Sequence, residues 1–137
     1  MARPVTALSS GTILVVLTDE PTSLTDAYAL IKRLAQSGRV GGIQIVINMA
    51  TDHNEGQRTA ATLINAAQGF LNLTLPIAGI IRRDPKVRDA IRRQQPFLGR
   101  HQQSPAAADI LAMVENLSRN HLHSPQPTPV KLTAGIR

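Results

Sequence analysis

Polar residues that could bind a small ligand follow each of three apolar segments of the chain. Glu20, Ser23 and Asp26 come after the first apolar run, and Asn48 ends the second. The tripeptide 82–84, Arg-Arg-Asp, follows the third. Because open α/β sheets collect their ligands at the carboxyl ends of parallel strands, the turn after the first strand marks the functional edge, and the other two positions are candidates with it.

The residue types at these positions suit binding rather than catalysis. Glu20 and Asp26 have no partnering histidine or metal-ligand pattern, so they do not indicate a general acid–base pair. The amide of Asn48 offers a donor and an acceptor, which suits the edge of a purine as well as the backbone of its own turn. The sequence therefore predicts no catalytic residue. It also predicts no zinc site from its four histidines, His53, His101, His121 and His123.

Ser23 and Asp26 have the spacing of a variant capping box at a helix start. The hydroxyl would accept from an early helix N–H, and the carboxylate would lie at the positive end of the helix dipole. Glu20 and Asp26 thus have two interpretations, helix stabilisation and contact with a ligand or partner. The two roles do not exclude one another.

Apolar runs predict three strands that would position the candidate site. The runs 13–17, 43–47 and 75–81 are rich in β-branched residues and are bounded by polar or glycine-containing segments. The first is continuously apolar, which is typical of a strand covered on both faces in a parallel sheet.

Helical periodicity predicts helices after these strands. A helix follows the turn at Ser23, another covers 60–71, and Asp84–Pro85 and Ser104–Pro105 read as a cap followed by a first-turn proline. The spacing predicts inward-facing residues in the last two helices: Val87, Ala90 and Ile91 in one, and Ile110, Leu111, Val114 and Leu117 in the other.

The resulting order is β-α-β-α-β-α-α. It predicts an α/β fold, a partial doubly wound parallel sheet of about three strands with flanking helices. We assign residues 1–119 to this partial domain. Residues 120–137 become proline-rich and non-periodic from His121, which indicates a disordered tail.

Composition narrows the function classes. The 137 residues suffice for one small domain, and the absence of cysteine excludes disulfides and thiolate catalysis. No apolar stretch approaches a membrane span, so we expect a cytoplasmic protein. The net charge of +6 permits attraction to nucleic acid or an anionic membrane, but aromatic residues make up only 2% and no nucleic-acid motif is present. Nucleic-acid binding is therefore not expected.

One dense basic cluster follows the third strand. Its members would flank the apolar side of a helix, which is typical of a solvated surface, and contact with an acidic partner, lipid or phosphate is the alternative. The cluster comprises Arg82, Arg83, Lys86, Arg88, Arg92 and Arg93.

Three segments together resemble a known family. EPTSLTDAYALIKRL, IVINMA and GIIRRDPKVRDAIRRQQPFL are similar to the second half of a MinD/ParA-type P-loop ATPase, most of all to the FlhG/FleN branch that controls flagellar number and placement. The resemblance spans roughly Gly11 to Met113. It implies that segment 1–10 is the remnant of a helix that precedes the first strand.

The resemblance implies a nucleotide site. It assigns Asn48 to the adenine and the loop Arg82-Arg83-Asp84 to closure over the base, with Arg82 where the family usually has proline. Glu20, Ser23 and Asp26 are assigned to the nucleotide and dimer interface. For the complete family protein it implies ATP or ADP with Mg²⁺.

The family's first half is not visible, because no segment matches G-x-x-x-x-G-K-[ST]. We therefore expect no ATP hydrolysis and no or weak nucleotide binding by this chain alone. Two functions stay open: an ATPase half that joins its missing N-terminal half or a second copy, and a stand-alone interaction module without catalysis. Flagellar assembly or regulatory proteins are the implied partners. A membrane-targeting amphipathic helix is not evident, so membrane binding is not expected.

The resemblance also makes the strand 13–17 an interior strand whose neighbour is missing. That strand has no lysine, proline or inward charge to protect a free edge. We therefore expect the chain to self-associate through this edge or to need a complementary polypeptide.

Overall fold

The computed structural model describes residues 11–39 and 41–123, and the predicted order of strands and helices is confirmed with one short helix added. The elements are β1 (Ile13–Leu17), α1 (Pro21–Gln36), β2 (Ile43–Ala50), α2 (His53–Leu71), β3 (Ile77–Arg82), α3 (Pro85–Arg92), α4 (Phe97–Arg100) and α5 (Pro105–His123). Helix α4 has four residues and no apolar periodicity of its own, so the sequence pattern did not reveal it.

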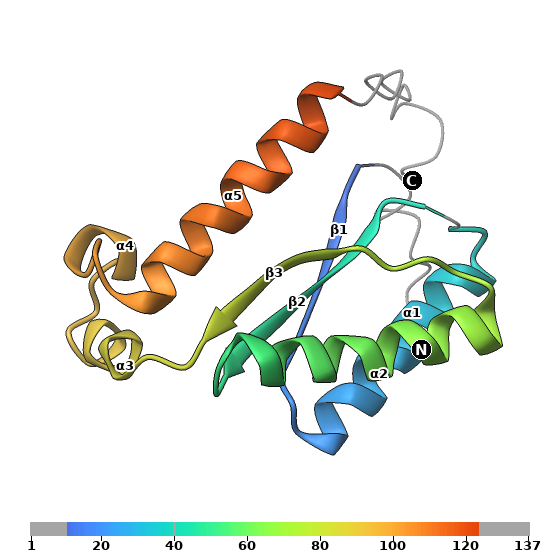
Figure 1. Cartoon of the computed structure of the whole chain (residues 1–137), viewed down its shortest axis with the longest axis horizontal. Coiled ribbons are helices and arrows are strands. Elements are labelled where there is room, and N and C mark those ends of the chain that lie inside the picture. The colour runs from blue at the N-terminus through green and yellow to red at the C-terminus, as the bar shows by residue number, and fades with distance from the viewer. Residues whose placement is uncertain (1–10, 40, 124–137) are drawn as a thin grey trace, which may run out of the picture.

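The three strands form a parallel sheet in the order β1-β2-β3. Helices α1 and α2 lie on one face and α5 on the other, while α3 and α4 lie together at one end of the molecule (Figure 1). The predicted α/β class with helices on both faces is therefore confirmed. No helix among the described residues is long and apolar enough to cross a bilayer.

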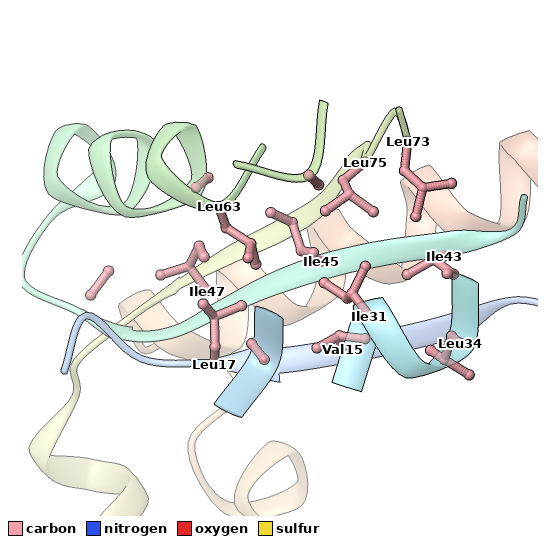
Figure 2. Packing of buried hydrophobic residues seen from close by; sticks show 14 residues of the cluster. Val15, Leu17, Ile31, Leu34, Ile43, Ile45, Ile47, Leu63, Leu73 and Leu75 are labelled. Atoms are coloured by element: carbon pink, nitrogen blue, oxygen red, sulfur yellow. The ribbon is translucent and has the colours of Figure 1, made fainter. Parts of the chain in front are cut away.

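The larger core lies between the sheet and helices α1 and α2 (Figure 2). Alternate strand residues point into it because successive side chains of a strand point to opposite faces. Its members include Val15 and Leu17 of β1, Ile43, Ile45 and Ile47 of β2, and Ile31, Leu34 and Leu63 of the helices. All of them are aliphatic, as the low aromatic content requires.

The smaller core lies between the sheet and α5. Val46 and Ala78 contribute from the strands, and Ala106, Ile110 and Met113 contribute from α5. A Cβ on Gly79 would come within 2.8 Å of the Met113 Cβ, so glycine at this position lets α5 lie close to β3.

Four residues predicted to be buried are exposed, and those predictions are wrong. Leu111 and Val114 of α5 are 53% and 48% exposed, because Met113 takes the sheet-facing position beside Ile110. Ile91 of α3 is 68% exposed, since α3 buries only its flank with Ala90. In β1, Val16 is 59% exposed, and so β1 is not covered on both faces.

Helix α5 continues to His123, so the first residues of the predicted tail are helical. The rest of that tail, 124–137, and the predicted helical remnant 1–10 lie outside the described residues.

Replacing Gly56 by alanine should lower the free energy of unfolding by about 1–3 kcal/mol. The Cβ of the alanine would lie 2.3 Å from Cγ2 of Ile80 in β3. Because this side chain is β-branched, it has little freedom to move away from α2. Gly69 is the matched control in the same helix, because a Cβ there has no neighbour within 4 Å. Gly69→Ala should stabilise by up to about 1 kcal/mol. Urea unfolding measures both, and equal effects would contradict the close packing of α2 on β3.

Candidate functional site

The carboxyl ends of the three strands lie side by side, as the sequence predicts for the candidate site. In the register, Leu17 of β1 is opposite Ile47, and Ala50 of β2 is opposite Arg82. Asn48 therefore lies between the turn after β1 and the loop after β3. The register shifts between Ile47 and Ala50, which marks a bulge next to Asn48.

The side chain of Asn48 is not engaged by the described part of the fold. It is half-buried, and its amide makes no hydrogen bond with another described residue. The next residue, Met49, has φ of +58°, in the left-handed region that costs a residue with a side chain about 1–2 kcal/mol. Strained backbone of this kind concentrates at ligand sites, so the bulge marks this position as a candidate for ligand contact.

Arg82 is held by α5. Its backbone N–H and its Nε each donate to Oδ2 of Asp109 at 2.9 Å, and its Nη2 lies 3.2 Å from Oδ1. Nε2 of His53, at the start of α2, lies 3.0 Å from the same Oδ1. Burial alone would raise the pKa of Asp109, but the hydrogen bonds from Arg82 and His53 lower it below its usual value. Asp109 thus joins β3, α2 and α5.

Asp84 caps two helices at once. Its Oδ1 accepts from the backbone N–H of Lys86 in α3 at 3.0 Å, and its Oδ2 accepts from that of Ala106 in α5 at 3.2 Å. Burial would raise the pKa of Asp84, but these two backbone bonds, with one from the Ser104 hydroxyl, lower it. The predicted capping of α3 by Asp84 is confirmed, and Asp84 also caps α5.

Arg83 lies between these two engaged residues and faces solvent. Its backbone N–H donates to the carbonyl of Ala50 at 2.7 Å, which continues the pairing of β2 with β3. Its contact with a nucleotide base remains a prediction.

The predicted capping pair of Ser23 and Asp26 is wrong. Helix α1 begins earlier, at Pro21, because the fixed φ of proline suits a first turn and its missing N–H leaves no donor unpaired there. Glu20 occupies the cap position without a side-chain bond. Ser23 instead accepts from the backbone N–H of Thr18 at 2.9 Å, which ties the end of β1 to the first turn of α1. Asp26 and Glu20 remain exposed, and their interface role stays a prediction.

Part of the basic cluster is neutralised internally. Asp89 accepts from Nε of Arg93 and of Arg100 at 3.0 Å each, and Nε2 of His101 lies 2.9 Å away. Hydrogen bonds from His101, Arg93 and Arg100 hold the pKa of Asp89 far below its usual value. Arg88 and Arg92 face solvent on α3. In the described part of the chain, no three His, Cys, Asp or Glu side chains are grouped so as to hold a metal ion.

Sequence reasoning missed Asp109 and His53. Asp109 lies 27 residues from Arg82 in the chain, and His53 lies 56 residues from Asp109. The available signal was an acidic residue directly before the predicted apolar positions of the last helix, and the periodicity did not connect it with Arg82.

The fold of this chain is similar to that of MinD. MinD of Aquifex aeolicus superposes with a TM-score of 0.59 over 84% of this chain and 46% of that chain, at 22% identity. A chain of the MinC:MinD cell division protein complex of the same organism superposes with a TM-score of 0.60 over 89% of this chain and 46% of that chain, at 20% identity. At these identities the likeness shows the fold.

In sequence, the chain is similar to the antiactivator FleN of Pseudomonas aeruginosa, with 34% identity over 105 residues. The match covers 77% of this chain and 38% of FleN, so the chain spans well under half of that relative. No protein-family model matches. The two comparisons confirm the resemblance to part of a MinD/ParA-type protein near FleN.

Proposed function

We propose that this chain is the base-binding and dimer-forming part of a FleN-like regulator of flagellar number or placement, acting in the cytoplasm. The similarity to FleN carries the regulatory role. The amide of Asn48, which has no partner among the described residues, lies beside the strained Met49, and this supports adenine contact. Glu20 and Asp26, exposed at the start of α1, are proposed to face a partner or a nucleotide phosphate.

Catalysis is not proposed for the chain alone. Arg82 and Asp84 are occupied by Asp109 and by two helix starts, and the sequence contains no phosphate-binding loop to hold ATP with Mg²⁺. Within the complete ATPase, a phosphate loop supplied from elsewhere would add that chemistry.

Nucleotide binding tests the proposal. The chain alone should bind ATP near or weaker than millimolar, about 4 kcal/mol, and Asn48→Ala should remove the binding. Asn65→Ala on the exposed surface of α2 is the matched control and should leave it unchanged. Calorimetry measures the affinity, and phosphate release should not exceed a no-protein blank. Binding that survives Asn48→Ala, or release that persists after rigorous purification, would contradict the proposal.

A non-catalytic interaction module is the second candidate. The observation that favours it is the engagement of Arg82 and Asp84, two of the three residues of the predicted base loop, in contacts of the fold itself. Absence of any ATP binding together with retained binding to a flagellar regulatory protein would select this function.

A further inference from the structure

A polar hollow lies at the end of the molecule where α3 and α4 lie together (Figure 1). Its volume is about 440 Å³, within the range of about 300–1,000 Å³ that is typical of small-molecule sites. We call it the α3–α4 hollow. It is lined by Lys86 at the start of α3, by Gly99 and Arg100 at the end of α4, and by 101–104, which lead into α5. None of these lining residues has an apolar or acidic side chain, so the hollow suits a hydrophilic ligand.

Positive charge exceeds negative charge around the α3–α4 hollow. Arg100 and His101 both contact the carboxylate of Asp89, which also accepts a hydrogen bond from Arg93. One carboxylate is therefore shared by two arginines and a histidine, and it balances the charge of only one guanidinium. Lys86 adds another positive charge to the lining.

The carboxylate nearest to Lys86 in the chain is already engaged. Asp84 is buried and accepts from the backbone N–H groups of Lys86 and Ala106 and from the Ser104 hydroxyl. It attracts the Lys86 ammonium without forming an ion pair with it. The exposed ammonium of Lys86 thus makes no ion pair or hydrogen bond with a described residue, and its three donors are available to a ligand.

Other lining side chains also have donors to spare. Arg100 uses Nε for Asp89 and Nη1 for Oε1 of Gln95, at 3.0 and 2.7 Å, so its Nη2 has no partner among the described residues. The exposed amides of Gln102 and Gln103 make no hydrogen bond with a described residue either. The hollow therefore combines excess positive charge with hydrogen-bond donors that the described fold does not use.

We propose that the α3–α4 hollow binds a small phosphorylated molecule, with its phosphate between the Lys86 ammonium and Nη2 of Arg100. A phosphate monoester carries about 1.5 to 2 negative charges at neutral pH and has three strong acceptor oxygens, which suit an ammonium and a guanidinium together. A carboxylate has one charge and two oxygens, and so it matches these donors less well. The site goes beyond the proposed function, because neither Asn48 nor 82–84 lines the hollow.

The rest of the lining narrows the ligand to a hydroxylated phosphate such as a sugar phosphate. The amides of Gln102 and Gln103 can donate to hydroxyl groups and accept from them. The imidazole of His101 already contacts the ring of Phe97, with 5.9 Å between the ring centroids. A segment of an acidic protein fits less well, because the buried centre of a protein interface is apolar and no apolar side chain lines this hollow.

Calorimetric titration of the chain with inorganic pyrophosphate and with glucose 6-phosphate tests the inference. The titrations are made at physiological ionic strength, which screens attraction between distant exposed charges. Both compounds should bind, and both should shift the amide resonances of 86 and 99–104 in NMR spectra. Lys86→Gln should weaken the binding about tenfold, because a hydrogen bond between charged groups is lost. Lys32→Gln on the exposed surface of α1 is the matched control, since it removes the same charge and should leave the affinity unchanged.

A second variant and two controls complete the design. Gln103→Glu brings a negative charge into the lining and should also weaken the binding of pyrophosphate. Asn48→Ala should leave it unchanged, which separates this site from the proposed adenine contact. Circular dichroism of each variant shows whether the fold is retained.

Four results would overturn the inference. The first is no binding of either phosphate compound, and the second is equal weakening by Lys86→Gln and Lys32→Gln, which would show unspecific attraction to a basic protein. The third is tighter binding of citrate than of pyrophosphate, which would identify a carboxylate ligand. The last is binding of a phosphoserine peptide at least about tenfold tighter than that of glucose 6-phosphate, which would place the phosphate on a polypeptide.

Discussion

Asp84→Ala should lower the free energy of unfolding by about 2 kcal/mol, roughly twice the loss typical of a single helix cap. One carboxylate accepts from the backbone N–H of Lys86 in α3 and from that of Ala106 in α5, so the substitution leaves both N–H groups without this acceptor. In α5 the Ser104 hydroxyl still accepts from the backbone N–H of Ala107. The side chain is also buried, which keeps water from replacing the lost acceptor.

Asp52 provides the control for this prediction. It caps α2 alone, where its Oδ1 accepts from the backbone N–H of Glu55 at 2.8 Å, and it is exposed. Asp52→Ala should therefore cost about 1 kcal/mol. Urea unfolding followed by circular dichroism compares the two variants, and equal losses would mean that Asp84 acts as a cap of α3 only.

The sequence allowed the order of elements to be predicted because local signals determined it. Three β-branched runs became strands, and Asp84–Pro85 became a helix start, since the cap and the proline act within a single turn. The likeness to part of a MinD-type protein was also evident, since the segments that carry it are contiguous. These features depend on residues close together in the chain.

The solvent exposure of apolar side chains was predicted less well than the order of elements, because it depends on which other elements pack against them. Leu111, Val114 and Ile91 have apolar side chains at helical spacing. Among the described residues, however, the sheet has three strands, α5 covers only part of one face, and α3 buries only Ala90. The sequence pattern cannot say that a helix has no sheet beneath one of its flanks. The same reasoning explains Val16, whose strand lies at the edge.

Within the candidate site, contacts between residues far apart in the chain determine which side chains are engaged by the fold. The sequence did not reveal these contacts. Arg82 was predicted to contact a nucleotide base, and its guanidinium instead meets Asp109 of α5. Contact of Arg82 with a nucleotide base would require its ion pair with Asp109 to break, or one of its guanidinium N–H groups to be shared between Asp109 and the base. Asn48 has no such competitor among the described residues, and so the fold leaves its side chain available for a ligand, as it does the exposed side chain of Arg83.

Asp109→Asn should lower the free energy of unfolding at neutral pH by about 2 kcal/mol. Removing one partner of a fully buried ion pair costs about 3–5 kcal/mol. The loss is smaller in this protein because the Arg82 side chain is 34% exposed and can be partly hydrated, although Asp109 itself is only 6% exposed. The amide keeps the shape of the side chain and one acceptor oxygen. The NH₂ group of the amide cannot accept a hydrogen bond from Arg82, and it cannot stabilise the positive charge of the guanidinium.

The pH dependence of stability separates loss of this charge from a packing defect. The pKa of Asp109 is lower in the folded protein than in the unfolded chain, so the unfolded chain binds the proton more tightly. Its contribution is complete above the unfolded pKa of about 4 and is lost as the pH falls from there through the folded pKa. Asp109→Asn should therefore flatten the decline of the unfolding free energy below about pH 4. Asp84 and Asp89, whose pKa values are also lowered, should maintain part of that decline. Urea unfolding from pH 6 down to pH 2.5 measures both curves. A variant curve that is merely displaced, with the wild-type slope retained, would show that Asp109 stabilises the fold through its shape and not through its charge.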